Sequence, residues 1–395
     1  MHPDHVASLR RARSLFALAV ACVIITSPAA AQEWTRRTPL PAPTGPFAVG
    51  VGTFHFTDST RATSRSMRTR PLTVQLWYPA RRSSVAERAP YVTEPALLVA
   101  MVRDGYLDLD SATIRDWARV RLVARRGAPP AAAPSARGWR VLVFSHGMGV
   151  ARMHYAALLQ ELASHGYVVL AIDHPIGGFT LDPSGRLLRP GVDSLHYPAR
   201  PMISLVRDWA IDDAVVLRRV AALLRTPSAS RVTLHLDTTR AGVAGHSLGG
   251  AAALQACRPP SSFVACADLD GAPFGDVETE GAGKPILVLL SEPDRRRDPP
   301  PRDSAESARR RRFAAMGRER DSTWSAICAL QRGVRCDIVK LRGTGHFSFS
   351  DAPFQFPAQL RGVGATMSPV EMHHTIARRL LDFFDHALPD APSSR

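Results

Sequence analysis

The sequence predicts a single α/β domain in which helices cover both faces of a mostly parallel central sheet. Two observations predict this fold class. Apolar runs as long as a buried strand recur along the chain, and segments with one apolar helical face separate them. Such alternation indicates a parallel sheet, because each connection between parallel strands has to cross back over the sheet. The 395 residues, 45% apolar and 22% charged, suit one large soluble domain.

The elements follow one another in a regular order. Two alternating segments, "VGTFHFT" and "LTVQLWYPA", predict a first pair of strands. Six apolar runs then predict buried strands at residues 140–147, 167–175, 240–247, 263–271, 284–294 and 336–346. Helices are expected between or after these strands at 154–166, 204–225 and 370–388. We therefore expect one domain over residues 47–388.

Two segments depart from this alternation. The first, residues 91–138, carries Leu97, Leu98, Met101 and Val102 at helical spacing and ends in a Pro/Ala-rich linker. An ordinary packed helix is the simplest interpretation, and a cap over the site or a contact with a lipid surface is the alternative. The second segment, about 295–320, is rich in Arg and Pro, and we expect it to be an exposed excursion.

The first 31 residues have the pattern of an export signal. Three arginines precede the apolar run "SLFALAVACVIITS", and Ala29 and Ala31 stand before Gln32 in a small-x-small arrangement. The apolar run is short for a membrane span. We expect cleavage after residue 31, a loose mature N-terminus over residues 32–46, and a periplasmic or secreted protein. An uncleaved anchor is the alternative.

The charge and the cysteines limit the partners. The net charge of +15 comes almost entirely from arginine, but no zinc-finger or RNA-binding signature accompanies it, so we expect no nucleic-acid partner. The cysteines beyond the signal are Cys257, Cys266, Cys328 and Cys336, none in a CxxC spacing, so we expect no metal site. An exported protein permits disulfides. Of the three possible pairings we expect the local one, Cys257 with Cys266 and Cys328 with Cys336.

A serine between glycines is the first candidate for chemistry. "GHSLG", residues 245–249, fits G-x-S-x-G and lies between an apolar strand and a run that can form a helix. A sharp turn in that context lifts Ser247 above the sheet, and the helix after it points N–H groups at the serine. We therefore predict that Ser247 is a nucleophile.

A serine nucleophile requires a base and an acid, in the chain order Ser, acid, His. His346 follows the last strand in a Gly-rich loop and is the predicted base. Asp270 ends one strand after the serine, and Asp294 ends the next. Chain order alone does not choose between the two aspartates.

The oxyanion of the intermediate needs two N–H donors. The residue after the nucleophile, Leu248, supplies one. The other is expected from the loop after an earlier strand, "FSHGMG", and Met148 is the predicted donor.

The segments quoted above, with "ELASHGYVVLAIDH", "CADLDG" and "LRGTGHFSFSD", resemble the plasma-type platelet-activating factor acetylhydrolases and their bacterial relatives, a branch of the α/β-hydrolases. The resemblance covers roughly residues 45–385. It implies the α/β-hydrolase fold and an acid in a Leu-Asp pair, which matches Leu269-Asp270 and favours Asp270 over Asp294. Met148 and Leu248 match the family's oxyanion positions.

The resemblance implies an exported esterase that cleaves short or oxidised acyl esters of phospholipids through a Ser-His-Asp triad, without a metal or cofactor. A cutinase-like, polyester-hydrolase-like or general short-chain esterase is the alternative, and a non-catalytic binding protein on the same fold is a third. We expect a monomer that acts on a small-molecule or lipid ester, with peripheral contact with a lipid surface possible.

Overall fold

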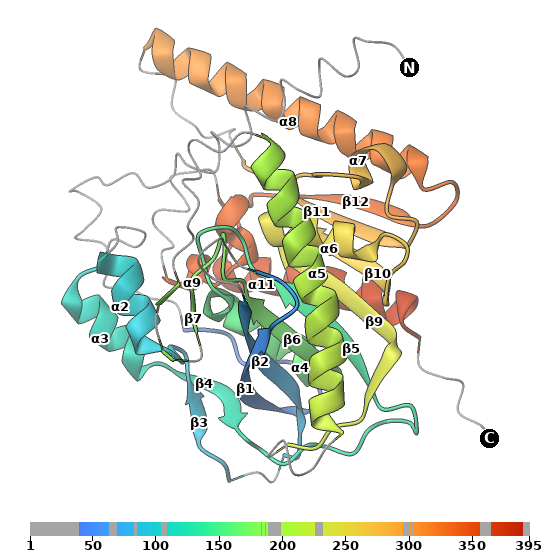
Figure 1. Cartoon of the computed structure of the whole chain (residues 1–395). Coiled ribbons are helices and arrows are strands. Elements are labelled where there is room, and N and C mark those ends of the chain that lie inside the picture. Colours follow the sequence, from blue (N-terminus) through green and yellow to red (C-terminus); the bar gives the residue numbers. More distant parts are fainter. Residues whose placement is uncertain are drawn as a thin grey trace.

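The computed structural model describes residues 39–62, 69–82, 85–103, 109–182, 184–185, 187–188, 199–225, 232–294, 301, 303–355 and 365–389. In this part of the chain a ten-stranded sheet runs through the molecule in the order β12-β11-β10-β9-β5-β6-β2-β1-β4-β3 (Figure 1). Its strands are β1 (Ala48–Asp58), β2 (Arg70–Ala80), β3 (Arg88–Pro90), β4 (Arg121–Arg126), β5 (Trp139–Ser145), β6 (Tyr167–Asp173), β9 (Leu236–His246), β10 (Phe263–Leu269), β11 (Ile286–Glu292) and β12 (Cys336–Arg342).

Six neighbouring strands, β12, β11, β10, β9, β5 and β6, are all parallel, which confirms the predicted fold class. β2 pairs antiparallel with both β1 and β6. A separate two-stranded sheet joins β7 (Thr180–Leu181) to β8 (Leu187–Leu188). Because the carboxyl ends of parallel strands lie at one edge, the turns that leave β5, β9, β10 and β12 come together there.

Helices cover both faces of the sheet, as expected. The helices are α2 (Pro95–Arg103), α3 (Ser111–Arg119), α4 (Ala156–Ser164), α5 (Ala199–Leu224), α6 (Leu248–Cys257), α7 (Val277–Glu280), α8 (Ser304–Leu330), α9 (Ala352–Gln355) and α11 (Pro369–Ala387), with 3-10 turns η2 (Arg152–Tyr155) and η3 (His346–Phe349). α4 and α11 pack on one face, and α5 and α6 pack on the other.

The alternation of side chains along β5 builds both cores at once. Leu142 and Phe144 enter the core beneath α4 and α11, whereas Val141 and Val143 enter the core beneath α5 and α6. Successive side chains of a strand point to opposite faces, so a strand buried on both sides has to be apolar throughout.

The segment 91–138 forms packed helices and also extends the sheet. Leu97, Leu98 and Met101 of α2 are buried in the main core, so the simplest interpretation of this helix is confirmed. After α3, β4 pairs in parallel with β1, and β3 pairs antiparallel with β4. These last two strands of the sheet were not predicted, because their sequences carry arginines on the solvent-facing side.

The segment near 295–320, expected to be an exposed excursion, is in large part the first half of a helix, and none of its side chains described between residues 303 and 320 is buried. Residues 304–330 form the long helix α8, which Figure 1 shows along the top of the molecule beside α7. Asp303 caps its N-terminus by accepting a hydrogen bond from the Glu306 N–H at 2.7 Å. Towards the C-terminal end of α8, Trp324 and Ile327 are fully buried in the core beneath α5 and α6. Exposed arginines on the first half conceal this buried face in the sequence.

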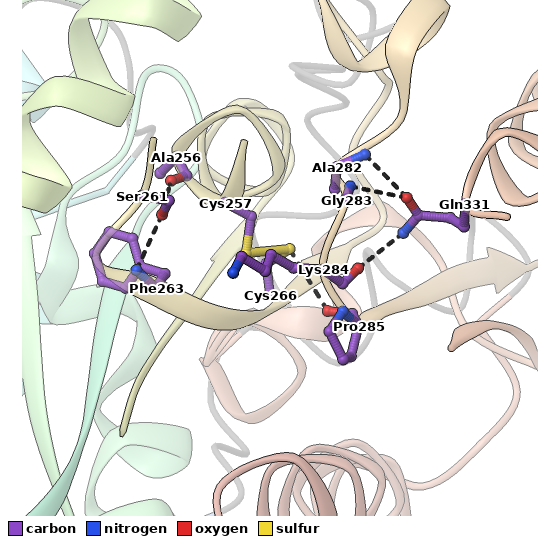
Figure 2. Close-up of a disulfide and its surroundings, with 10 residues drawn as sticks. All are labelled: Ala256, Cys257, Ser261, Phe263, Cys266, Ala282, Gly283, Lys284, Pro285 and Gln331. Atoms are coloured by element: carbon purple, nitrogen blue, oxygen red, sulfur yellow. Dashed lines mark hydrogen bonds between the residues drawn. A yellow bond between two sulfur atoms is a disulfide. The ribbon is translucent and has the colours of Figure 1, made fainter. Parts of the chain in front are cut away.

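Two disulfides have the local pairing that the sequence predicts. Cys257 at the end of α6 is bonded to Cys266 in β10, as Figure 2 shows, and Cys328 of α8 is bonded to Cys336 of β12. Beside the first disulfide, Gln331 receives the Ala282 and Gly283 N–H groups on its Oε1, at 3.1 and 3.0 Å. These contacts fix α8 to the sheet at its C-terminal end.

The predicted signal, residues 1–31, and the first part of the expected loose N-terminus lie outside the described residues. Among the helices that are described, none is both long enough and apolar enough to cross a bilayer.

Candidate active site

Ser247 occupies a strained turn between β9 and α6. Its backbone has φ 57° and ψ −119°, in the left-handed half of conformational space that a side-chain-bearing residue rarely adopts. The flanking glycines make the turn possible. A Cβ on Gly245 would overlap the Gly249 backbone, and a Cβ on Gly249 would overlap the carbonyl oxygens of Ser145 and His146. The turn therefore holds the serine at the carboxyl edge of the sheet, as predicted from G-x-S-x-G.

The imidazole of His346 lies between Ser247 and Asp270. Its Nε2 is 3.0 Å from Ser247 Oγ, and its Nδ1 is 2.8 Å from Asp270 Oδ2. The 3-10 turn η3 positions the ring directly after β12, and the Gly345 N–H donates to Ser348 Oγ at 2.8 Å to fix that turn. The His346 side chain is 26% exposed, whereas Asp270 and Ser247 are only 3% and 6% exposed, so the imidazole is the most solvent-accessible of the three groups.

Asp270 accepts four hydrogen bonds. Oδ1 receives the Ser291 N–H at 2.7 Å and Arg320 Nη1 at 3.0 Å, while Oδ2 receives the Ser291 hydroxyl at 2.8 Å in addition to His346. Burial alone would raise the pKa of Asp270, but the hydrogen bond and charge of His346, with the charge of Arg320, hold it below its ordinary value. The carboxylate is therefore ionised and fixed in orientation.

The alternative acid, Asp294, lies just beyond the end of β11 and is partly exposed. Asp270 is the hydrogen-bond partner of His346 Nδ1. The structure therefore brings Ser247, His346 and Asp270 together in one line of hydrogen bonds, and Asp294 lies outside it. The geometry therefore favours the same aspartate as the family resemblance.

The two predicted oxyanion donors belong to two turns that meet at the serine, since a Cβ on Gly147, one residue before Met148, would lie 3.4 Å from Ser247 Cβ. Leu248 is the first residue of α6, where the N–H groups of the first turn have no partner inside the helix. In the loop after β5, the Gly147 N–H donates to the Tyr155 hydroxyl at 3.0 Å, and the Gly149 N–H donates to the Gly177 carbonyl at 2.7 Å. Of these three successive amides, Met148 alone has no acceptor within the described residues, which suits it to bind an oxyanion.

A neutral histidine joins the two halves of the site. His246 lies 2.9 Å through Nε2 from the His346 carbonyl oxygen and 2.8 Å through Nδ1 from the Tyr155 hydroxyl. That hydroxyl accepts the Gly147 N–H. Burial and the adjacent His346 lower the pKa of His246 to about 3, so its ring is uncharged. Sequence reasoning missed this bridge, because 91 residues separate its two side chains.

A second Ser–His–Asp line lies deeper in the protein. The Ser145 hydroxyl is 2.9 Å from His174 Nε2, and His174 Nδ1 is 2.8 Å from Asp212 Oδ2. Ser145 also contacts Asp213, at 2.7 Å. All four side chains are 0% exposed. A substrate cannot reach this serine, so the line is a buried network that ties α5 to β5 and β6.

Among the described residues, His, Cys, Asp and Glu nowhere gather in a group of three that could hold a metal ion. The functional candidates that the sequence did not suggest are Ser291 and Arg320, which contact Asp270, and the His246–Tyr155 pair. No short motif marks them. Arg320 lies within a run of arginines, and only the folded helix shows which of them reaches the acid.

Comparison with known proteins places these residues in a family. Residues 33–175 match the family described as platelet-activating factor acetylhydrolase, isoform II, and residues 142–336 match the α/β-hydrolase family. The "Probable 1-alkyl-2-acetylglycerophosphocholine esterase" of Arthroderma benhamiae is 26% identical over 254 residues, 62% of each chain. The "Platelet-activating factor acetylhydrolase" of Canis lupus familiaris is 28% identical over 180 residues, 38% of this chain and 40% of its own. The chain thus spans about three fifths or less of these curated relatives.

A solved structure matches over more of the length. The ferulic acid esterase from Streptomyces cinnamoneus is 30% identical with a TM-score of 0.66, and the match covers 91% of this chain and 97% of that one.

Proposed function

We propose, from the premise that the chain belongs to the α/β-hydrolase family and is related to the platelet-activating factor acetylhydrolases, that it is a serine carboxylic-ester hydrolase. One observation carries the proposal: His346 contacts Ser247 Oγ with one ring nitrogen and Asp270 with the other, at 3.0 and 2.8 Å. A base within hydrogen-bond reach of the nucleophile, itself oriented by a carboxylate, is the arrangement that activates a serine.

The first half of the proposed reaction forms an acyl-enzyme. Ser247 Oγ gives its proton to His346 Nε2 as it attacks the ester carbonyl carbon. The carbonyl oxygen becomes an oxyanion that accepts hydrogen bonds from the N–H groups of Leu248 and Met148. Each of these hydrogen bonds should lower the barrier by about 3–4 kcal/mol. His346 then returns the proton to the departing alcohol as the carbon–oxygen bond breaks. Asp270 stabilises the imidazolium throughout and does not itself take up the proton.

The second half of the proposed reaction releases the carboxylic acid product. Water gives a proton to His346 Nε2 as it attacks the acyl carbon. The new oxyanion again accepts hydrogen bonds from the two N–H groups. The proton then returns to Ser247 Oγ as the acyl group leaves. The cycle uses no metal and no cofactor.

For the substrate we propose a short or oxidised acyl ester of a phospholipid. The names of the fungal and mammalian relatives support this class. A second class, aryl or short-chain esters without a phospholipid, is supported by the ferulic acid esterase, whose match covers nearly the whole of both chains. Polyester hydrolysis belongs to this second class. A non-catalytic binding protein is the remaining rival.

Two measurements test the proposal. A fluorophosphonate probe should label the wild-type protein and not Ser247→Ala, and Ser247→Ala should lose hydrolysis of short p-nitrophenyl esters. Ser145→Ala is the matched control: it removes a serine from the other Ser–His–Asp line and should retain labelling. If the probe does not label the wild-type protein, the binding-protein alternative replaces the esterase.

A substrate panel separates the two classes. It should contain a 2-acetyl phospholipid, its long-acyl counterpart, methyl ferulate and p-nitrophenyl esters of increasing chain length. Highest kcat/KM on the 2-acetyl phospholipid supports the first class. Highest kcat/KM on methyl ferulate, or on esters without a head group, assigns the enzyme to the second.

We also propose that the protein is exported, through cleavage after residue 31. The signal-like segment supports this, and so do the two disulfides, which form in oxidising compartments. N-terminal sequencing of the protein recovered from the periplasm or medium should begin at Gln32. A cytoplasmic protein that retains its N-terminus would contradict export.

A further inference from the structure

We propose that Arg320 of α8 is a positioning residue for the reaction, because its guanidinium group contacts both the acid Asp270 and the strand end that holds this acid. The inference rests on the proposed function, since it assigns Arg320 a role through Asp270. It also assigns a function to one arginine of the Arg-rich segment, namely to position the acid of the proposed Ser247–His346–Asp270 triad.

The geometry is specific to this arginine. Nη1 donates to Asp270 Oδ1 at 3.0 Å, and Nη2 donates to the Ser291 carbonyl oxygen at 3.2 Å. The fork of the guanidinium thereby spans the carboxylate and the end of β11. Ser291 holds the same carboxylate through its N–H and its hydroxyl. With Oδ1 fixed in this way, Oδ2 is directed at His346.

Of two neighbouring buried carboxyl groups, Asp268 and Asp270, Arg320 donates its hydrogen bond to the one that carries the charge. Asp268, two residues earlier on β10, is fully buried, and its hydrogen-bond partner is the Gly271 N–H at 2.5 Å. Two buried carboxylates this close cannot both ionise at low cost. Burial raises the pKa of Asp268 well above its ordinary value, whereas His346 and Arg320 lower that of Asp270. The negative charge therefore resides on the residue that faces the base.

The position of Arg320 along α8 explains why its side chain reaches Asp270. Arg320, Trp324 and Ile327 lie at i, i+4 and i+7, so they share one face of α8. Trp324 and Ile327 are buried in the core, and Arg320 extends the same face to the edge of the sheet with 19% of its side chain exposed. Arg318 lies on a different face and is exposed, which makes it the matched control.

The test compares Arg320→Gln, Arg320→Lys, Arg320→Ala and Arg318→Gln in the full chain. The first readout is the rate at which a fluorophosphonate labels Ser247, and the second is kcat and KM on the best ester. Arg320→Gln should slow labelling and lower kcat by roughly tenfold to a hundredfold, as expected for loss of a charged hydrogen bond, with little change in KM. Arg320→Lys should recover part of the loss, and Arg318→Gln should match the wild type.

Two further measurements distinguish this role from general stabilisation. Added ethylguanidinium should restore part of the labelling rate of Arg320→Ala, because it supplies the atoms that this substitution removes. In an Asp270→Asn background, Arg320→Gln should have little additional effect, whereas a purely structural role would slow both backgrounds by the same factor. Thermal unfolding of each variant separates a folding loss from a catalytic one.

The outcomes are distinct for the two proposals. If Arg320→Gln labels and turns over at the wild-type rate while Ser247→Ala is inactive, the inference fails and the esterase proposal stands. If the panel of esters is not hydrolysed but Arg320→Gln still slows labelling, the substrate class is wrong and the inference stands. Failure of the wild type to label overturns both.

Discussion

The Nδ1 atom of His246 lies 2.8 Å from the Tyr155 hydroxyl, and this hydrogen bond ties the loop of the candidate base to the loop of a candidate oxyanion donor. On one side His246 contacts the His346 carbonyl oxygen, and on the other Tyr155 receives the Gly147 N–H, one residue before Met148. A chain of buried hydrogen bonds through His246 and Tyr155 therefore links the loop of His346 to the loop of Met148.

Removal of this connection should lower catalysis more than binding. Tyr155→Phe leaves the Gly147 N–H and His246 Nδ1 without a partner, which should cost about 1–3 kcal/mol of stability and lower kcat roughly tenfold to a hundredfold with a smaller change in KM. Tyr78→Phe is the control, because Tyr78 donates an equally buried hydrogen bond, to the Ala128 carbonyl at 2.7 Å, away from the site. Steady-state kinetics and urea unfolding of both variants give the answer. Equal kcat values in the two variants would contradict the connection.

The two candidate acids should differ by orders of magnitude. Asp270→Asn removes the charge that faces the imidazolium and should lower kcat by roughly three to four orders of magnitude. Asp294→Asn should remain within a few-fold of the wild type, because Asp294 lies outside the line from Ser247 through His346 to Asp270. Measurement of kcat for both variants on one ester decides the matter. A larger loss in Asp294→Asn would reassign the acid.

Two glycine substitutions should have different effects: one should lower activity, and the other should raise stability. Gly249→Ala places a methyl group against the Ser145 and His146 carbonyl oxygens, so the serine turn has to shift, and activity should fall by at least a hundredfold. Gly317→Ala in α8 meets open space and removes a glycine from a helix interior, which should stabilise the protein by about 0.5–1 kcal/mol. Activity assays and thermal unfolding report both effects. An active Gly249→Ala would show that the turn tolerates a side chain.

Asp351 should make stability depend on pH. It is buried, it accepts the Ala157 N–H at 3.1 Å, and burial raises its pKa to about 7. An aspartate in an unfolded chain has a pKa of about 3.9, so folding takes up a proton between these values. The contribution of Asp351 to stability is therefore greatest below pH 4 and is lost as the pH rises towards 7, by roughly 4 kcal/mol in all.

The comparison that isolates this group is Asp351→Asn against wild type by urea unfolding at several pH values from 4 to 8. The variant cannot titrate at this position, so its stability relative to wild type should increase as the pH rises. Parallel stability curves for the two proteins would show that Asp351 has an ordinary pKa.

The sequence predicted the parts of the site that local chemistry encodes. Ser247 follows β9 directly, His346 lies four residues beyond the end of β12, and a glycine-rich turn after a strand has few alternative conformations. The mostly parallel sheet with helices on both faces follows from the same kind of local pattern, the alternation of apolar runs with amphipathic segments. Asp270 was different: two strands each ended in an aspartate, and only the family resemblance chose between them.

The remaining parts depend on tertiary packing that no local pattern records. Arg320 is one arginine among many, and it is distinguished only by sharing a helical face with Trp324 and Ile327. Tyr155 and His246 meet across the β5 and β9 turns. β4 was missed because exposed residues, mostly arginines, alternate with its buried ones, and its pairing with β1 is visible only once the chain has folded.

The bond between Cys328 and Cys336 has a practical consequence for producing the enzyme. It fastens the end of α8 to β12, the strand that leads into the loop of His346. A preparation made in a reducing cytoplasm would lack this covalent bond, and side-chain packing and hydrogen bonds would then have to keep Arg320 at Asp270. Specific activities from different expression hosts should therefore be compared only after free thiols have been counted.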